Sequence, residues 1–302
     1  MQTANEKIYT KYYVVALLAL FCAFLWGSAF PSIKIGYELF SVSSSYEKIA
    51  FAGIRFFISS LLIFTFCLLS KRKLKLKRKN LYHLLALGLI QTTIQYILFY
   101  IGLSNTSGTK GSILSATNTL FSVLLVQFFY KEDKLSLKKV IGLILGFSGV
   151  VIVNLAGSNI EGGFNFFGDG FIILSSLLGA IGGIYTKKLT KEVDAFLISG
   201  YQLLLGSLFL MGAGFLGGAG SLAFSTKGLA LLLYLGFVSA AAFSIWAVLL
   251  KYNHVSKVTI YKFSIPLFGV FLSYILLGER LMGTNVIASV VLVSLSIILI
   301  SR

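Results

Sequence analysis

Long apolar stretches follow one another along almost the whole chain. The hydrocarbon core of a bilayer is about 30 Å thick, so a helix needs about 20 apolar residues to cross it. Lipid offers no hydrogen-bond partners to the backbone, which restricts crossing segments of this kind to helices. The sequence therefore predicts an all-α polytopic membrane protein with ten transmembrane helices, at 13–34, 49–70, 81–103, 109–130, 138–155, 168–187, 194–216, 228–250, 256–278 and 284–301.

Composition excludes an ordinary soluble domain. The 302 residues are 57% hydrophobic and only 12% charged, whereas soluble domains carry about 25% charged residues. A net charge of +16 would suggest a nucleic-acid partner in a soluble protein. Here the basic run at 71–79, "KRKLKLKRK", occupies a connection between two predicted spans. We therefore expect the lipid bilayer as the partner of this chain and no nucleic acid.

The basic residues also predict the orientation. Nineteen of the 26 Lys and Arg residues lie at the termini or in the connections on the same side, and five lie on the other side. Connections rich in Lys and Arg stay in the cytoplasm. We expect a multi-pass protein of the cell inner (plasma) membrane with cytoplasmic N- and C-termini.

The chain repeats itself at a spacing of 147 residues. "GIRFFISSLL" (53–62) aligns with "GYQLLLGSLF" (200–209), and "FSVLLVQFFYKE" (121–132) with "FGVFLSYILLGE" (268–279). Each repeat holds five spans, so the second enters the membrane from the opposite side. The interpretation is two inverted five-helix repeats, at 1–155 and 165–302. Transporters commonly use this plan, with the substrate between the halves.

Three features resemble EamA-type members of the drug/metabolite transporter superfamily: "LWGSAFPSIKIG" (25–36), Arg55 early in a span, and Pro266 followed by "GERL" at 278–281. The resemblance implies a ten-helix carrier with a central cavity shared by both halves, which exports amino acids or other small metabolites. The first half departs from the pattern. "KEDKL" (131–135) replaces its GER-like ending, and Asn118–Thr119 replace the proline, so its gating hinge is expected to differ.

Polar and aromatic residues inside the spans predict a substrate cavity, because a mixture of amides, hydroxyls and rings suits a partly apolar organic solute. The alternative is that such residues only bind neighbouring helices together. The candidate cavity residues are Trp26, Ser28, Arg55, Gln91, Gln95, Tyr96, Ser115, Asn118, Tyr185, Gln202, Trp246 and Lys262.

The two charged candidates leave two interpretations open. Lys262 lies on a stripe with Pro266, and its repeat mate is Ser115; the repeat mate of Arg55 is Gln202. Either cation reaches the membrane surface by extending its side chain, or it faces the cavity and pairs with an anionic group of the substrate. The second interpretation fits a carboxylate or phosphate and favours zwitterionic amino acids.

The remaining chemistry points away from catalysis. All ten carboxylates and both histidines lie in connections or at span ends, which leaves no metal site, no cofactor site and no paired acids at mid-membrane. We expect a transporter for small organic metabolites that works by alternating access, and not an enzyme. The alternatives are a membrane scaffold, an enzyme without an identifiable catalytic site, or a channel, which lacks a filter-like loop. The sequence leaves the oligomeric state open.

Overall fold

The computed structural model describes residues 8–72, 74–106, 108–155, 163–220, 222, 225–278 and 283–301. Its helices are α2 (Tyr12–Leu39), α3 (Ser45–Leu69), α4 (Arg78–Gly88), the π-helix η1 (Leu89–Ile94), α5 (Gln95–Ser104), α6 (Gly108–Ser115), α7 (Thr117–Phe129), α8 (Leu137–Leu155), the π-helix η2 (Phe166–Gly170), α9 (Phe171–Leu189), α10 (Ala195–Leu216), α11 (Thr226–Tyr252), α12 (Val255–Thr259), the 3₁₀-helix η3 (Ile260–Phe263), α13 (Ser264–Leu277) and α14 (Gly283–Ser301). Some of these join end to end: α4–η1–α5, α6–α7, η2–α9 and α12–η3–α13 each form one span.

The described chain contains ten helical segments long and apolar enough to cross a membrane, so the predicted all-α class and the ten spans are confirmed. Several spans extend beyond their predicted bounds. The first continues to Leu39, and the second begins at Ser45. The early start follows from a capping box, in which the Ser44 hydroxyl accepts from the Glu47 amide (3.2 Å) and the Glu47 carboxylate accepts from the Ser44 amide (2.9 Å).

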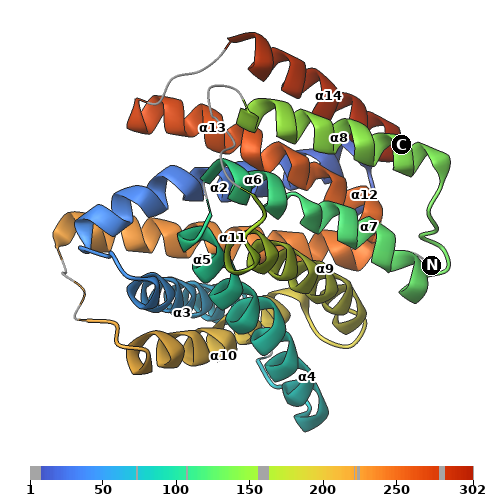
Figure 1. Ribbon diagram of the computed structural model, residues 1–302. Coiled ribbons are helices and arrows are strands. Elements are labelled where there is room, and N and C mark those ends of the chain that lie inside the picture. Colours follow the sequence, from blue (N-terminus) through green and yellow to red (C-terminus); the bar gives the residue numbers. More distant parts are fainter. Residues whose placement is uncertain are drawn as a thin grey trace.

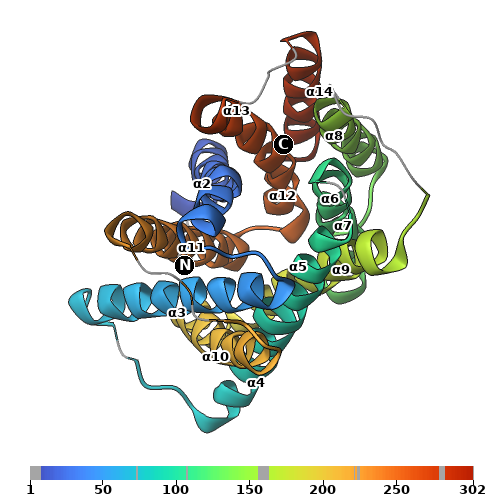
Figure 2. The same ribbon diagram turned by 60° about the vertical axis from the view of Figure 1, so that its left-hand side comes forward.

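The helices are arranged with the symmetry of an inverted repeat. Two helix pairs have the most extensive contacts, α3 with α10 and α8 with α14, and each joins one helix to its counterpart in the other half. Between these pairs, α2 packs against α11 and α13, while α9 packs against α7 and α5. Figures 1 and 2 show the α8–α14 pair and the α3–α10 pair at opposite ends of the molecule, with the other helices between them.

Small residues bring the paired helices close together, as expected where lipid removes the hydrophobic drive for helix association. A Cβ on Gly206 would lie 2.4 Å from the Cβ of Thr92 and 2.7 Å from the Gly88 carbonyl oxygen, so only glycine fits this crossing of α10 over span 3. In the α8–α14 pair, the Ser296 hydroxyl donates to the Gly142 carbonyl at 2.6 Å.

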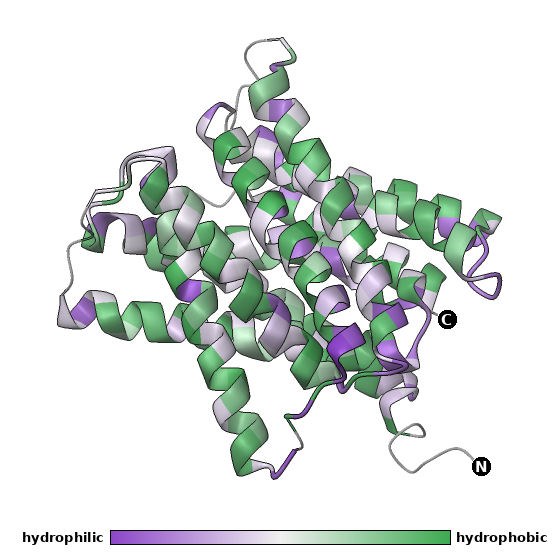
Figure 3. Cartoon of the chain, turned by 90° about the horizontal axis from the view of Figure 1, so that it is seen from below, coloured by the Kyte–Doolittle hydropathy of each residue, from purple (hydrophilic) through white to green (hydrophobic). Residues whose placement is uncertain are grey.

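The outer surface is apolar. Leu17, Phe128 and Leu216 are 70%, 77% and 92% exposed, and hydrophobic residues dominate the helices while hydrophilic ones gather in the connections (Figure 3). Such a surface is stable against acyl chains and not against water. The chain is therefore a multi-pass membrane protein.

Both halves interrupt one span at equivalent positions. Span 4 breaks between α6 and α7 at Ala116, and span 9 tightens into η3, which ends at Phe263, 147 residues later. Span 4 has no proline. Instead, Thr117 donates its hydroxyl to the Leu114 carbonyl, and such bonds compete with the helical pattern. The interruption of span 4 therefore lies at the position equivalent to the end of η3, although span 4 has no proline.

Candidate functional site

Lys262 points into the helix bundle. Its ammonium donates to Oδ1 of Asn118 at 2.9 Å and lies 5.8 Å from the ring centre of Trp26 and 5.2 Å from that of Trp246. These three partners come from α7, α2 and α11, so the charge faces protein groups from three helices instead of the membrane surface. Aromatic faces attract a cation at this range.

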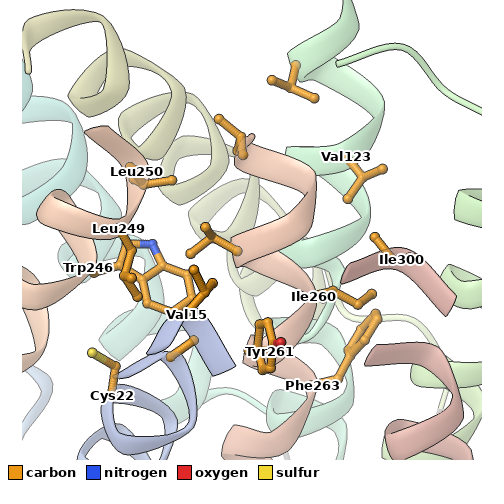
Figure 4. Close-up of a cluster of buried hydrophobic side chains, with 14 of the residues drawn as sticks. Val15, Cys22, Val123, Trp246, Leu249, Leu250, Ile260, Tyr261, Phe263 and Ile300 are labelled. Carbon is orange, nitrogen blue, oxygen red and sulfur yellow. The ribbon is translucent and has the colours of Figure 1, made fainter. Parts of the chain in front are cut away.

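The neighbours of Lys262 fix its direction. Tyr261 and Phe263, on either side of it in η3, have no exposed surface. Both belong to the buried cluster that also contains Trp246 (Figure 4). Because these flanking side chains are held in the core, the 3₁₀ turn carries Lys262 toward Asn118 and the two tryptophans.

Both polar atoms of the Asn118 amide form hydrogen bonds. Its Oδ1 accepts from Lys262, and its Nδ2 donates to the Ser176 carbonyl of α9 at 2.9 Å. This second bond fixes the orientation of the amide, so that the oxygen faces the ammonium. The lysine from the second repeat is thereby held by a residue of the first.

Two glycines of α9 make room for further amides. A Cβ on Gly179 would lie 2.5 Å from Nδ2 of Asn118 and 3.0 Å from Nε2 of Gln95, and a Cβ on Gly182 would lie 2.6 Å from Cδ of Gln91. The predicted amides Gln91, Gln95 and Asn118 therefore lie along one face of α9. Oε1 of Gln95 is buried and has no partner among the described residues.

Aromatic rings continue from the lysine across the interior. Trp26 contacts Trp246 (5.1 Å between ring centres) and Phe243 (5.8 Å), and Phe243 contacts Phe56 (6.3 Å). Phe56 in turn contacts Tyr96 at 4.6 Å. All of these contacts are edge-to-face, the arrangement that ring quadrupoles favour. We call Trp26, Phe243 and Phe56 the aromatic wall.

Arg55 lies at the far end of this wall. Its guanidinium carbon is 4.4 Å from the ring centre of Phe56, and the residue is 4% exposed. Because α3 begins at Ser45, Arg55 is ten residues into the helix, about 15 Å from its first residue. Its side chain is buried within the protein and does not extend to the membrane surface.

Four of the candidate residues make contacts elsewhere. Ser28 joins α2 to α11 through Tyr234 (2.7 Å between hydroxyls), and Gln202 donates to Thr92 at 3.4 Å in the α10–η1 contact. Ser115 donates to the Gly111 carbonyl of its own helix, and Tyr185 contacts His83 at 2.7 Å. These hydrogen bonds are those of helix packing, and none of them reaches Lys262.

A second polar cluster joins the halves at the end of the bundle where α2 begins and α14 ends, here called the terminus side. The carboxylate of Asp133, which is 2% exposed, accepts from the Ser256 amide (3.0 Å), the Ser256 hydroxyl and Lys139 (2.6 Å). Burial raises the pKa of this carboxyl, but these hydrogen bonds outweigh it and hold the pKa below its usual range. We call this contact the Asp133–Ser256 latch.

Sequence reasoning missed several of these residues. Nothing in the local pattern distinguishes Phe243 and Phe56 from other phenylalanines that face lipid or the core. Gly179 and Gly182 were detectable, since small residues three apart mark a helix face that admits a close neighbour. Asp133 was placed in a connection, where its burial depends on the distant Ser256.

The fold and the interior describe a membrane transporter: two inverted repeats enclose polar and aromatic groups contributed by both. The model of the EamA-like transporter family matches residues 14–155 and again 166–302. The chain belongs to this family, as its resemblance indicated.

Related proteins are also described as transporters. The uncharacterized transporter YvbV of Bacillus subtilis is 31% identical over 87% of this chain and 84% of its own length. An uncharacterized transporter of Archaeoglobus fulgidus is 26% identical over 89% of this chain and 91% of its own. One crystal structure superimposes with a TM-score of 0.79 over 95% of this chain and 98% of its own, with 14% identity, and therefore shows the fold alone.

Proposed function

We propose that this protein carries small organic metabolites with a carboxylate group, amino acids foremost, across the cytoplasmic membrane. The observation that carries the proposal is the environment of Lys262: a cation inside the bundle, held by Asn118 and two tryptophans, with no ion pair to a carboxylate among the residues that the structure describes. A charge at this depth is costly unless it has a function or a partner. A carboxylate from the substrate would supply the partner.

The aromatic wall supports an amino acid as substrate. Tryptophan and phenylalanine faces bind apolar side chains, and they also attract an ammonium group by cation–π contact. Gln91 and Gln95 add donors and acceptors along the α9 face. A solute with a charged head and an apolar body fits these groups better than an inorganic ion does.

Alternating access between the halves, at 1–155 and 165–302, is the proposed mechanism. The Asp133–Ser256 latch joins the connection before α8 to the start of α12, so it links the two halves on the terminus side. Opening that side requires the latch to break. The basic residues favour the cytoplasm for this side, and export is then passage from the latched side outward.

Transport by reconstituted protein tests the proposal. Proteoliposomes are loaded with the twenty common amino acids, and efflux is measured by mass spectrometry. The best substrate is then compared with its carboxamide analogue in wild type and Lys262→Met. We expect the variant to raise the apparent KM and to lose the preference for the carboxylate. Equal discrimination in both proteins, or no flux of any amino acid, would contradict the proposal.

A further inference from the structure

Arg55 is a buried cation without an acceptor. It is 4% exposed, its Nε has no partner, and no hydrogen bond or ion pair joins its guanidinium to another residue that the structure describes. A guanidinium presents five N–H donors. Burying such a group with only the Phe56 ring against it is unfavourable, because its hydration is lost and nothing replaces it.

Hydroxyl groups surround the same point. Tyr37 and Tyr96 lie within electrostatic reach of Arg55, and Tyr100 within reach of both tyrosines. The Tyr37 hydroxyl is itself buried without a hydrogen-bond partner. The guanidinium and the unpartnered Tyr37 hydroxyl offer donors and no negative charge, so an anion is the ligand that would complete this cluster.

The carboxylates of Asp169 and Glu47 are engaged elsewhere. Asp169 accepts from Thr106 (2.5 Å) and Lys110 (3.4 Å), and the Glu47 carboxylate accepts from the Ser44 amide in the cap of α3. The protein therefore supplies no counter-ion to Arg55 from these groups.

The aromatic wall connects this cluster to Lys262. Trp26 is at one end, under the lysine ammonium, and Phe56 is at the other, under the guanidinium. Lys262 is seven residues past the start of α12 and Arg55 ten past the start of α3, and the two helices enter from opposite sides. Between them, the ring centres of Trp26 and Phe243 are 5.8 Å apart and those of Phe243 and Phe56 are 6.3 Å apart, so a continuous row of rings joins the two charges.

We propose that Arg55, Tyr37, Tyr96 and Tyr100 form a second anion subsite. The substrate class is an organic acid with two negative groups, one at Lys262 and one at Arg55, and an apolar middle against the aromatic wall. This inference rests on the proposed function, because it takes the Lys262 site as the first subsite. It restricts that function to dicarboxylates, acidic amino acids included.

Tryptophan fluorescence of the purified protein gives a direct test. The chain has two tryptophans, and both contact Lys262, so binding at the wall changes their emission without any transport assay. The probes are alkanedioates of four to eight carbons and alkanoates of the same lengths. We expect the best dioate to bind wild type about tenfold or more tighter than its matched alkanoate, as charge-assisted bonds provide.

Variants test whether Arg55 causes the difference in affinity between dioates and alkanoates. Arg55→Gln should reduce dioate affinity to that of the alkanoate while leaving alkanoate binding unchanged. Lys262→Met should weaken both. Tyr37→Phe, which keeps the ring and removes the hydroxyl, should reduce the dioate preference by a few fold. Gln127→Leu is the control, because Gln127 bonds only the Leu124 carbonyl of its own helix.

Two results would overturn the inference. One is equal affinity of wild type for dioates and alkanoates; the other is a dioate preference that survives in Arg55→Gln. If alkanoate binding still depends on Lys262 in those cases, the proposed function stands and only the second subsite fails. Should Arg55→Gln not fold, Tyr37→Phe and Arg55→Lys carry the test, since lysine keeps the charge and loses the planar fork.

Discussion

The ammonium of Lys262 lies 2.9 Å from Oδ1 of Asn118, although 144 residues separate them in the chain. The two residues come from the interrupted spans of opposite halves, next to the positions where each span is distorted. A movement of one half relative to the other therefore changes this contact directly. It links the candidate site to the two interruptions.

Replacing Gly179 by alanine should disturb the site at little cost in stability. The new Cβ would lie 2.5 Å from Nδ2 of Asn118 and 3.0 Å from Nε2 of Gln95, and these side-chain ends can move. We expect a raised apparent KM with an unfolding temperature close to wild type. Gly183→Ala on the same helix is the matched control, because a Cβ there meets nothing within 4 Å. Identical kinetics of the two variants would contradict the assignment.

Asn118→Leu removes the amide that orients Lys262 and leaves a side chain of similar size. The expected result is a loss of transport of at least about tenfold, as for a lost charge-assisted hydrogen bond, with normal insertion and monodispersity in detergent. Gln127→Leu removes an amide from the same helix and should transport normally. A wild-type transport rate in Asn118→Leu would show that Asn118 contributes only to helix packing.

Asp133→Asn should weaken the latch. Hydrogen bonds between a carboxylate and charged or amide donors contribute about 1.5–3 kcal/mol each, and part of this is lost when Lys139 faces a neutral amide. We expect a lower unfolding temperature in thermal scans. Glu132→Gln is the control, because Glu132 is next to Asp133 in the chain and its side chain is exposed. An unchanged unfolding temperature in Asp133→Asn would contradict a stabilising latch.

The pH dependence of the latch follows from the lowered pKa of Asp133. A depressed pKa means that the stabilisation is fully present above the ordinary aspartate value, about 3.9, and is lost as pH falls through the lower value of the folded protein. The difference in unfolding temperature between wild type and Asp133→Asn should therefore stay constant from about pH 5 to pH 8. A difference that disappears near pH 6 would show a raised pKa instead.

Labelling with a membrane-impermeant thiol reagent tests the orientation. Cys22 and Cys67 are buried and free, so a Cys22→Ser, Cys67→Ser background gives single-cysteine proteins. Lys75→Cys and Lys227→Cys form a matched pair of exposed positions at opposite ends of the bundle. In intact cells we expect labelling at position 227 and none at position 75. Labelling at position 75 and none at position 227 would show that the protein has the opposite orientation in the membrane.

The sequence by itself determined the membrane class, the ten spans, the two inverted repeats and the family resemblance. These follow from local properties: the length of each apolar run, and the pattern that recurs after 147 residues. The ends of the spans were less exact. The start of α3, for example, depends on a capping box that lies before the apolar run.

Only the tertiary structure decided which polar residues meet. Ser28 and Gln202 looked as suitable for a cavity as Asn118, yet they bond Tyr234 and Thr92 in helix contacts. Lys262 and Arg55 were equally ambiguous, and Phe243 gave no signal at all. The physical reason is that the rotation and crossing of each helix depend on packing between small residues far apart in the chain, such as Gly88 with Gly206. A shift of one position around a helix turns a side chain from the interior toward lipid.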